Sequence, residues 1–163
     1  MDGILGRVMQ IAVGLLLIVG VVVAAQNMFS SSKASNATSD LLALGQAIQG
    51  GYSAQPTFGT VTNTVVLAAG WVPSDMGSAK TSPTITNQWG GAVTVVVDTN
   101  TSQFDVTEAG VPDAACATML NGAQNAVSVT LNGTAIAGPP FDPGTISTSC
   151  NTASNTVKFV FGH

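Results

Sequence analysis

The sequence has 163 residues, of which 45% are apolar and only 7% are charged. Soluble domains average roughly 25% charged residues, so Ser, Thr, Asn, Gln and Gly must solvate most of the surface of a folded domain here. Four Lys and Arg residues against eight Asp and Glu residues give a net charge of −4. Nucleic-acid binding needs clustered basic side chains, so this balance excludes a general nucleic-acid binder.

The first predicted element is an apolar helix over residues 8–25, in which Gln10 is the only polar side chain. At about 1.5 Å per residue it would be roughly 27 Å long, close to the ~30 Å hydrocarbon core of a bilayer. Three interpretations stay open: a cleaved secretory signal, a permanent membrane anchor, and an apolar rod that waits in a membrane before it packs inside an assembly. We favour the rod, because residues 1–7 lack the basic cluster that signals and anchors usually carry.

The helical pattern continues beyond this segment, but there it has only one apolar face. Apolar side chains recur every three or four residues, the spacing of an amphipathic helix, at Ala34, Ala37, Leu41, Leu44 and Ile48. We expect this helix to end at Gly50 and Gly51, where glycine can adopt the left-handed conformation that terminates helices. One continuous helix over residues 3–50 is the favoured interpretation, and an anchor followed by a separate domain helix is the alternative.

Short runs rich in Val, Thr and Phe follow Gly51 and are bounded by turn residues, which predicts strands. The expected strands are Val61–Leu67, Ala92–Val97, Gln103–Thr107, Ala126–Leu131 and Thr156–Phe161. Residues 98–101 should form a hairpin connection. The fold class is therefore α+β, with a long N-terminal helix packed across an antiparallel sheet. Residues 1–27 are expected to form a protruding apolar helix, and residues 28–163 the globular head.

Two further segments carry local signals. Pro112–Gln124 predicts a short helix, since Pro112 and Asp113 suit a first turn. Its inward face is expected to carry Cys116, Met119, Leu120 and Ala123. The three prolines of Gly138–Gly144 predict a stiff loop.

Cys116 and Cys150 are the only cysteines. In a chain that displays its soluble part outside the cytoplasm, an even pair favours a disulfide, with two free buried cysteines as the alternative. The only histidine is His163, and the carboxylates that follow the predicted N-terminal helix show no metal-ligand spacing. These carboxylates are Asp75, Asp98, Asp105, Glu108, Asp113 and Asp142. The sequence therefore predicts neither an enzyme nor a bound metal or cofactor.

Four segments, in this order, resemble a known family: Trp71–Met76, Ile85–Gly91, Val111–Cys116 and Asn155–Phe161. Together with the apolar helix, its amphipathic continuation and the late cysteine pair, they are similar to type IV pilins. The closer resemblance is to the type IVb major pilins, which include the bundle-forming, toxin-coregulated and conjugative thin-pilus subunits. The resemblance implies the type IV pilin fold.

The resemblance also assigns roles to the N-terminus. It implies that Met1 is the first residue after a prepilin peptidase removes a leader, and that its amine is N-methylated. The family usually has Glu at the fifth position, and here that residue is Leu5. Because an unpaired buried charge is costly, we expect Asp2, Arg7 and the Met1 amine to compensate one another; the alternative is that residues 1–7 lie in a wetter layer.

The resemblance implies a major structural subunit that polymerises helically into an extracellular type IV pilus for adhesion, cell aggregation or conjugative contact. Its partners would be other copies of itself, the inner membrane before assembly, the pilus assembly machinery and the peptidase. The alternatives are a minor pilin or pseudopilin of a secretion-like system, and a membrane-anchored binding module that does not polymerise. The residues expected to pack in the filament core are Ile11, Val13, Gly14, Leu15, Leu16, Leu17, Ile18, Gly20, Val21 and Val22.

Overall fold

The computed structural model describes residues 30–79 and 83–163. The chain divides into two compact units, residues 1–32 and residues 33–163. The apolar segment 8–25, its filament-core residues and the N-terminal groups Met1, Asp2 and Arg7 lie outside the described residues. Among the helices within the described ranges, none combines the length and the hydropathy needed to cross a bilayer.

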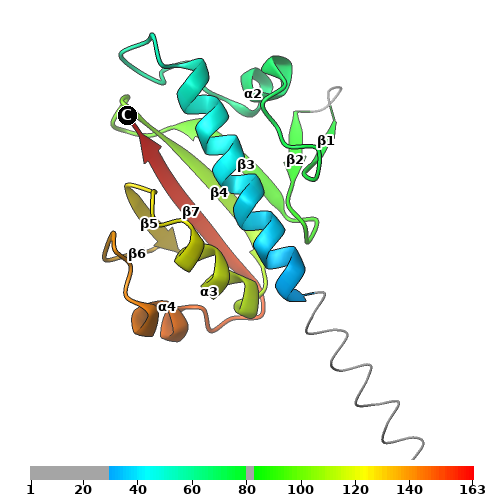
Figure 1. Cartoon of the computed structure of the whole chain (residues 1–163), viewed down its shortest axis with the longest axis vertical. Coiled ribbons are helices and arrows are strands. Elements are labelled where there is room, and N and C mark those ends of the chain that lie inside the picture. Colours follow the sequence, from blue (N-terminus) through cyan, green and yellow to red (C-terminus); the bar gives the residue numbers. More distant parts are fainter. Residues whose placement is uncertain (1–29, 80–82) are drawn as a thin grey trace, which may run out of the picture. The chain divides into compact units, whose positions relative to one another are not determined.

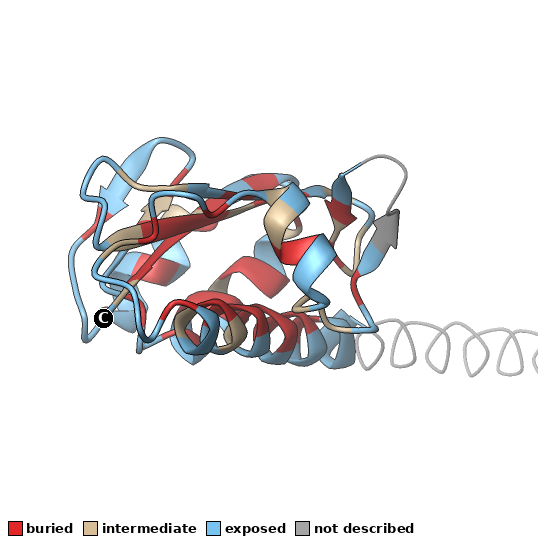
Figure 2. Cartoon of the chain, turned by 90° about the horizontal axis from the view of Figure 1, so that it is seen from above, coloured by how far each residue is buried: buried red, intermediate tan, exposed pale blue. Residues whose placement is uncertain are grey.

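The N-terminal helix occupies residues 30–51 of the described chain and crosses one face of the sheet (Figure 1). Its predicted apolar positions are all buried, each at most 2% exposed, and they face the sheet (Figure 2). The predicted left-handed end is wrong, because neither Gly50 nor Gly51 has a positive φ. The helix ends instead with a 3₁₀-type turn. The Tyr52 amide still donates to the Ile48 carbonyl, four residues back, at 3.0 Å, whereas the Ser53 amide donates to the Gly50 carbonyl, three residues back, at 3.3 Å.

The described residues form one antiparallel sheet of seven strands in the order β1-β2-β3-β4-β7-β5-β6. Its C-terminal strand β7 therefore lies between β4 and β5, near the centre of the sheet (Figure 1). The strands are β1 (Gly77–Ala79), β2 (Thr84–Thr86), β3 (Ala92–Val97), β4 (Gln103–Val111), β5 (Ser128–Leu131), β6 (Thr134–Ile136) and β7 (Asn155–Gly162). Four of the five predicted strands are confirmed, with β4 four residues longer than expected, while β1, β2 and β6 were not predicted.

The predicted strand Val61–Leu67 is wrong, because this segment forms helix α2 (Asn63–Ala69). Thr62 caps the helix, since its side chain accepts a bond from the Val65 amide, and such caps satisfy donors that a helix start leaves free. The Asn63 side chain accepts from the Val95 amide and donates to the Val93 carbonyl. An amide side chain thus occupies the edge of β3 where a strand would otherwise pair, and Val66 and Leu67 of α2 are buried in the core.

Two more helices lie in the C-terminal third of the sequence. Helix α3 (Asp113–Gly122) confirms the predicted helix, and all four residues of its expected inward face are buried. Helix α4 (Pro143–Ser149) was not predicted, and its first turn takes the end of the segment that we expected to be a loop.

The core fills the space between the N-terminal helix and the sheet. Its largest side chains are aromatic, with Phe58, Phe104, Phe159 and Phe161 at most 1% exposed. Trp71 and Trp89 are partly buried and pack against this core. Aromatic side chains therefore serve the interior of the head.

Candidate functional site

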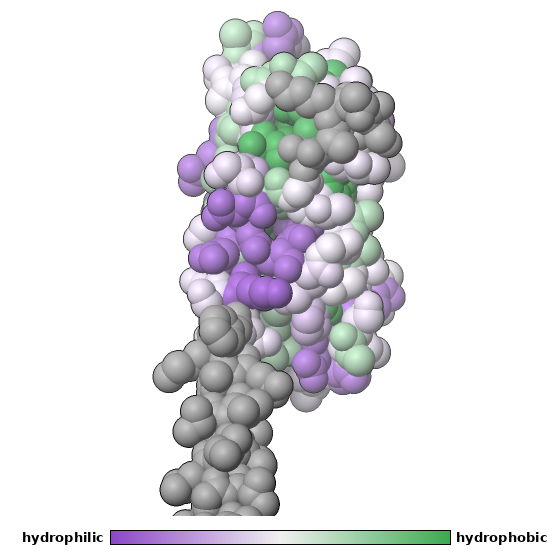
Figure 3. Space-filling model, turned by 90° about the vertical axis from the view of Figure 1, so that its right-hand side faces the viewer, coloured by the Kyte–Doolittle hydropathy of each residue, from purple (hydrophilic) through white to green (hydrophobic). Residues whose placement is uncertain are grey.

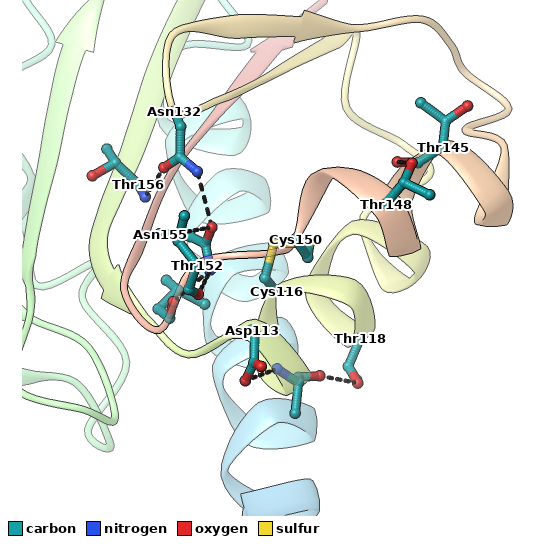
Figure 4. The surroundings of a disulfide bond; sticks show 12 residues. Asp113, Cys116, Thr118, Asn132, Thr145, Thr148, Cys150, Thr152, Asn155 and Thr156 are labelled. Atoms are coloured by element: carbon teal, nitrogen blue, oxygen red, sulfur yellow. Dashed lines mark hydrogen bonds between the residues drawn. A yellow bond between two sulfur atoms is a disulfide. The ribbon is translucent and has the colours of Figure 1, made fainter.

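A disulfide links the two C-terminal helices (Figure 4). Cys116 lies in α3 and Cys150 caps the end of α4, and their Cα atoms are 5.8 Å apart. Both cysteines are buried. The predicted pairing is thus confirmed, and it closes a loop of 34 residues that contains β5, β6 and α4.

Local sequence signals place both helices. Asp113 lies in the first turn of α3 and its carboxylate accepts a bond from the Ala114 amide at 2.7 Å, where the positive end of the helix dipole favours an anion. Asp142 caps α4, accepting from the backbone amide of Thr145 at 2.7 Å and from its hydroxyl at 2.9 Å. These two bonds lower the pKa of Asp142 below its usual value, and the bond from the Thr145 amide has the larger effect. Asp142 and Pro143 therefore begin a helix. An Asp cap followed by Pro is a known sequence signal for a helix start, but both residues lie in the predicted loop.

A network of side-chain amides fixes the segment that follows the disulfide (Figure 4). Asn155 is fully buried, and its amide nitrogen donates to the carbonyls of Val111 and Thr152. Its oxygen accepts from Asn132 at 2.9 Å and from the Thr152 hydroxyl. Asn132 has a φ of 50° in the tight turn between β5 and β6, and the Asn-Gly pair there is a hairpin signal. The network joins β4, the β5–β6 hairpin and the start of β7 around the disulfide.

One cluster of charges lies on the outer side of the β4–β7 pair. The Lys158 ammonium is 3.0 Å from Asp105 and 3.9 Å from Asp98. A bond from the Asn100 amide, aided by Lys158, lowers the pKa of Asp98, whereas burial raises the pKa of Asp105 in spite of Lys158. The cluster joins neighbouring strands, because Lys158 on β7 pairs with Asp105 on β4 and with Asp98 just after β3.

Neutral side chains dominate what the head offers to a partner. In the part of the chain that the structure describes, no three His, Cys, Asp or Glu residues lie close enough to hold a metal ion. A hollow beside α4 and the β5–β6 hairpin is lined by Asn132, Thr134, Thr148 and Asn151 among others, none of them charged. Figure 3 shows one face of the head, on which weakly polar residues surround a hydrophilic cluster and a smaller apolar one. Such a surface suits short-range contacts rather than long-range electrostatic attraction.

Comparison with known proteins identifies this architecture. No curated protein matches the sequence. Among solved structures, the chain is similar to TcpA, a type IV pilin from Vibrio cholerae El Tor biotype, with 14% identity and a TM-score of 0.51 over 83% of this chain and 98% of that one. At that identity the likeness concerns the fold, a helix packed on an antiparallel sheet. A family model described as PilS N terminal matches residues 31–162. Since that match spans most of the sequence, the chain belongs to the PilS family of type IV pilins, as the resemblance predicted.

Proposed function

We propose that the chain is the major structural subunit of a type IVb pilus, which it forms by helical polymerisation with copies of itself. The observation that carries the proposal is the sequence of residues 8–25, an apolar segment immediately before a head of the PilS family. A solved structure with this fold is a type IV pilin by its description. The subunit would be held in the inner membrane before assembly and would be extracellular afterwards.

The physical reason for polymerisation is the exposure of this segment. In a bilayer, lipid surrounds the apolar side chains of residues 8–25. Once a subunit leaves the membrane, each apolar side chain that meets water costs about 1.5–3 kcal/mol relative to a buried one. Packing the segments of many subunits around one axis buries them again, and a head-to-tail interface that does not close generates a helical filament.

A charge in this segment tests the proposal. Leu16→Asp is expected to abolish fibres in electron micrographs of sheared cell-surface material, because a carboxylate cannot be buried among apolar helices without a partner. The head should still fold, as judged by its near-ultraviolet circular dichroism and by an intact disulfide. Ser39→Asp is the matched control, since it places the same charge on an exposed position of the described helix. Normal fibres from Leu16→Asp would contradict the proposal.

The composition of the fibre separates the major subunit from its alternatives. A major pilin accounts for most of the protein mass of purified filaments, whereas a minor pilin or pseudopilin accounts for a small share. A binding module that does not polymerise would be found only as single molecules in membranes. Mass spectrometry of the filament also tests the proposed processing, because a methylated Met1 amine would follow prepilin peptidase cleavage. Comparing adhesion, aggregation and mating of cells with and without the fibre would then assign its role.

A further inference from the structure

Glu108 is a carboxylic acid with no access to solvent inside the head. It lies on β4, on the same inward face as Phe104 and Val106, and it is 0% exposed. Its neighbours across the sheet are Val93 on β3 and Val157 on β7. A β-bulge follows it on β4. An apolar side chain would be expected at such a position, so the acid calls for an explanation.

Neither carboxyl oxygen of Glu108 has a hydrogen-bond partner among the described residues. The amide of Asn87 is near enough to favour the charged form, but its nitrogen donates to the Ala109 carbonyl at 2.9 Å and its oxygen accepts from the Gly91 amide at 2.8 Å. A charged carboxylate without a partner is strongly disfavoured in an apolar interior. Burial above all, and then the charge of Asp40, raises the pKa of Glu108 from its ordinary value of 4.5 to about 7.

Asp40 connects this acid to a contact that holds the N-terminal helix. Asp40 is a buried residue of that helix, 8% exposed, and its carboxylate accepts a bond from the Gln88 side chain at 2.8 Å. The same nitrogen of Gln88 donates to the Asp75 carbonyl at 3.2 Å. Gln88 therefore ties the helix to the β2–β3 connection, residues 87–91.

Among the residues that the structure describes, no positively charged group acts on Glu108. The N-terminal helix contributes Asp40, and β3, β7 and the β2–β3 connection contribute Val93, Val157 and Asn87, which do not titrate. The carboxylate of Asp75 is exposed and bonds with Ser74. Ionisation of Glu108 would thus place a second negative charge beside Asp40 with nothing to offset it.

We propose that Glu108 is a pH-dependent switch between the N-terminal helix and the sheet. While Glu108 is protonated, Asp40 stays hydrogen-bonded to Gln88. When Glu108 loses its proton to solvent, the carboxylates of Glu108 and Asp40 repel one another and the contact between Asp40 and Gln88 opens. From pH 4.5 to about 7 the closed form keeps a proton that the open form releases. The ratio of the closed to the open form therefore falls about tenfold for each pH unit in this window, and it stays constant above the window. The inference concerns the head alone and does not depend on polymerisation.

A titration of one side chain tests the proton. Glu108 is the only glutamate in the chain, so selective ¹³C labelling of glutamate gives a single carboxyl resonance in the full-length protein in nonionic detergent. The expected midpoint is about 7, and Asp40→Asn should lower it by removing the repulsion. Asp75→Asn is the control, because it removes an exposed carboxylate next to the same glutamine. A wild-type midpoint near 4.5, or an Asp40→Asn midpoint equal to that of the wild type, would overturn the proposal.

Backbone amide exchange tests the opening itself. After correction for base catalysis, protection at residues 37–44 and 87–91 should fall about tenfold per pH unit between pH 5 and 7 and then level off. Glu108→Gln, which keeps the shape of the protonated acid, should make this protection independent of pH. The same slope of protection against pH in wild type and Glu108→Gln would refute the switch. If the variant fails to fold, a flat wild-type profile would refute it equally.

Discussion

Removing the disulfide should destabilise the head by an amount that the length of its loop sets. The perturbation is the double substitution Cys116→Ala with Cys150→Ala, which opens a loop of 34 residues. In the chain-entropy model, closing a loop of this length removes about 13 cal/mol/K from the unfolded chain, or about 4 kcal/mol at 25 °C. Single domains are usually stable by about 5–15 kcal/mol. The cross-link therefore supplies a large share of the free energy of unfolding.

Urea unfolding of the full-length chain in detergent measures this effect. With an m value of about 2 kcal/mol/M, a loss of about 4 kcal/mol moves the unfolding midpoint about 2 M lower. The m value should also rise slightly, because an unfolded chain without the cross-link exposes more surface. Near-ultraviolet circular dichroism follows the aromatic core rather than the helix content, so it reports on the head.

The reduced wild-type protein is the control for packing. It keeps both sulfur atoms, which are buried, but lacks the covalent link. Equal midpoints for reduced wild type and the double variant would assign the loss to loop entropy, whereas a lower midpoint for the variant would measure the packing of the sulfur atoms. A midpoint of the variant equal to that of the oxidised wild type would refute the reasoning.

Three further substitutions test other features of the head by thermal unfolding. A Cβ atom on Gly91 would clash with the Ala109 carbonyl oxygen, so Gly91→Ala should cost about 3 kcal/mol. Gly50→Ala, which meets nothing within 4 Å in the N-terminal helix, should instead be neutral or stabilise by up to about 1 kcal/mol; equal effects at the two sites would contradict the contact. Lys158→Met should raise the pKa of Asp105 further, because Lys158 now opposes the effect of burial. An acid with a raised pKa destabilises the folded state as the pH rises above its ordinary value, so the deficit of this variant should grow from pH 4 to pH 7, and a constant deficit would argue against the ion pair.

The parts of the fold that the sequence predicted are those with a long regular pattern. The apolar stripe of the N-terminal helix repeats over several turns, and β3 and β7 are runs of six and eight residues rich in Val, Thr and Phe. Segments of three residues, such as β1, β2 and β6, are too short to show a period. Val61–Leu67 was assigned wrongly because the decisive interactions are made by Thr62 and Asn63, and one of them reaches β3 some thirty residues away.

The buried acid shows a different limit of sequence-based prediction. Alternation along β4 places Phe104, Val106 and Glu108 on one face, yet the predicted strand ended at Thr107 because Glu-Ala-Gly is a poor strand sequence. The bulge after Glu108 lets the strand continue to Val111. Whether an inward acid finds a partner depends on the N-terminal helix and the β2–β3 connection, which are distant in sequence. Periodicity could have given the direction of the side chain, but not its isolation.

The order of the strands makes the head depend on its last residues. Because β7 lies between β4 and β5, the sheet falls into two separate parts, β1 to β4 and the β5–β6 hairpin, until residues 155–162 pair with both. Cys150 and Asn155, which attach α3 and the hairpin to the rest of the head, belong to the same stretch. The aromatic face of β7 also supplies Phe159 and Phe161 to the core beneath the N-terminal helix. One segment, residues 150–162, thus completes the sheet, the core and the disulfide together, so we expect the head to reach its stable form only once this segment is in place.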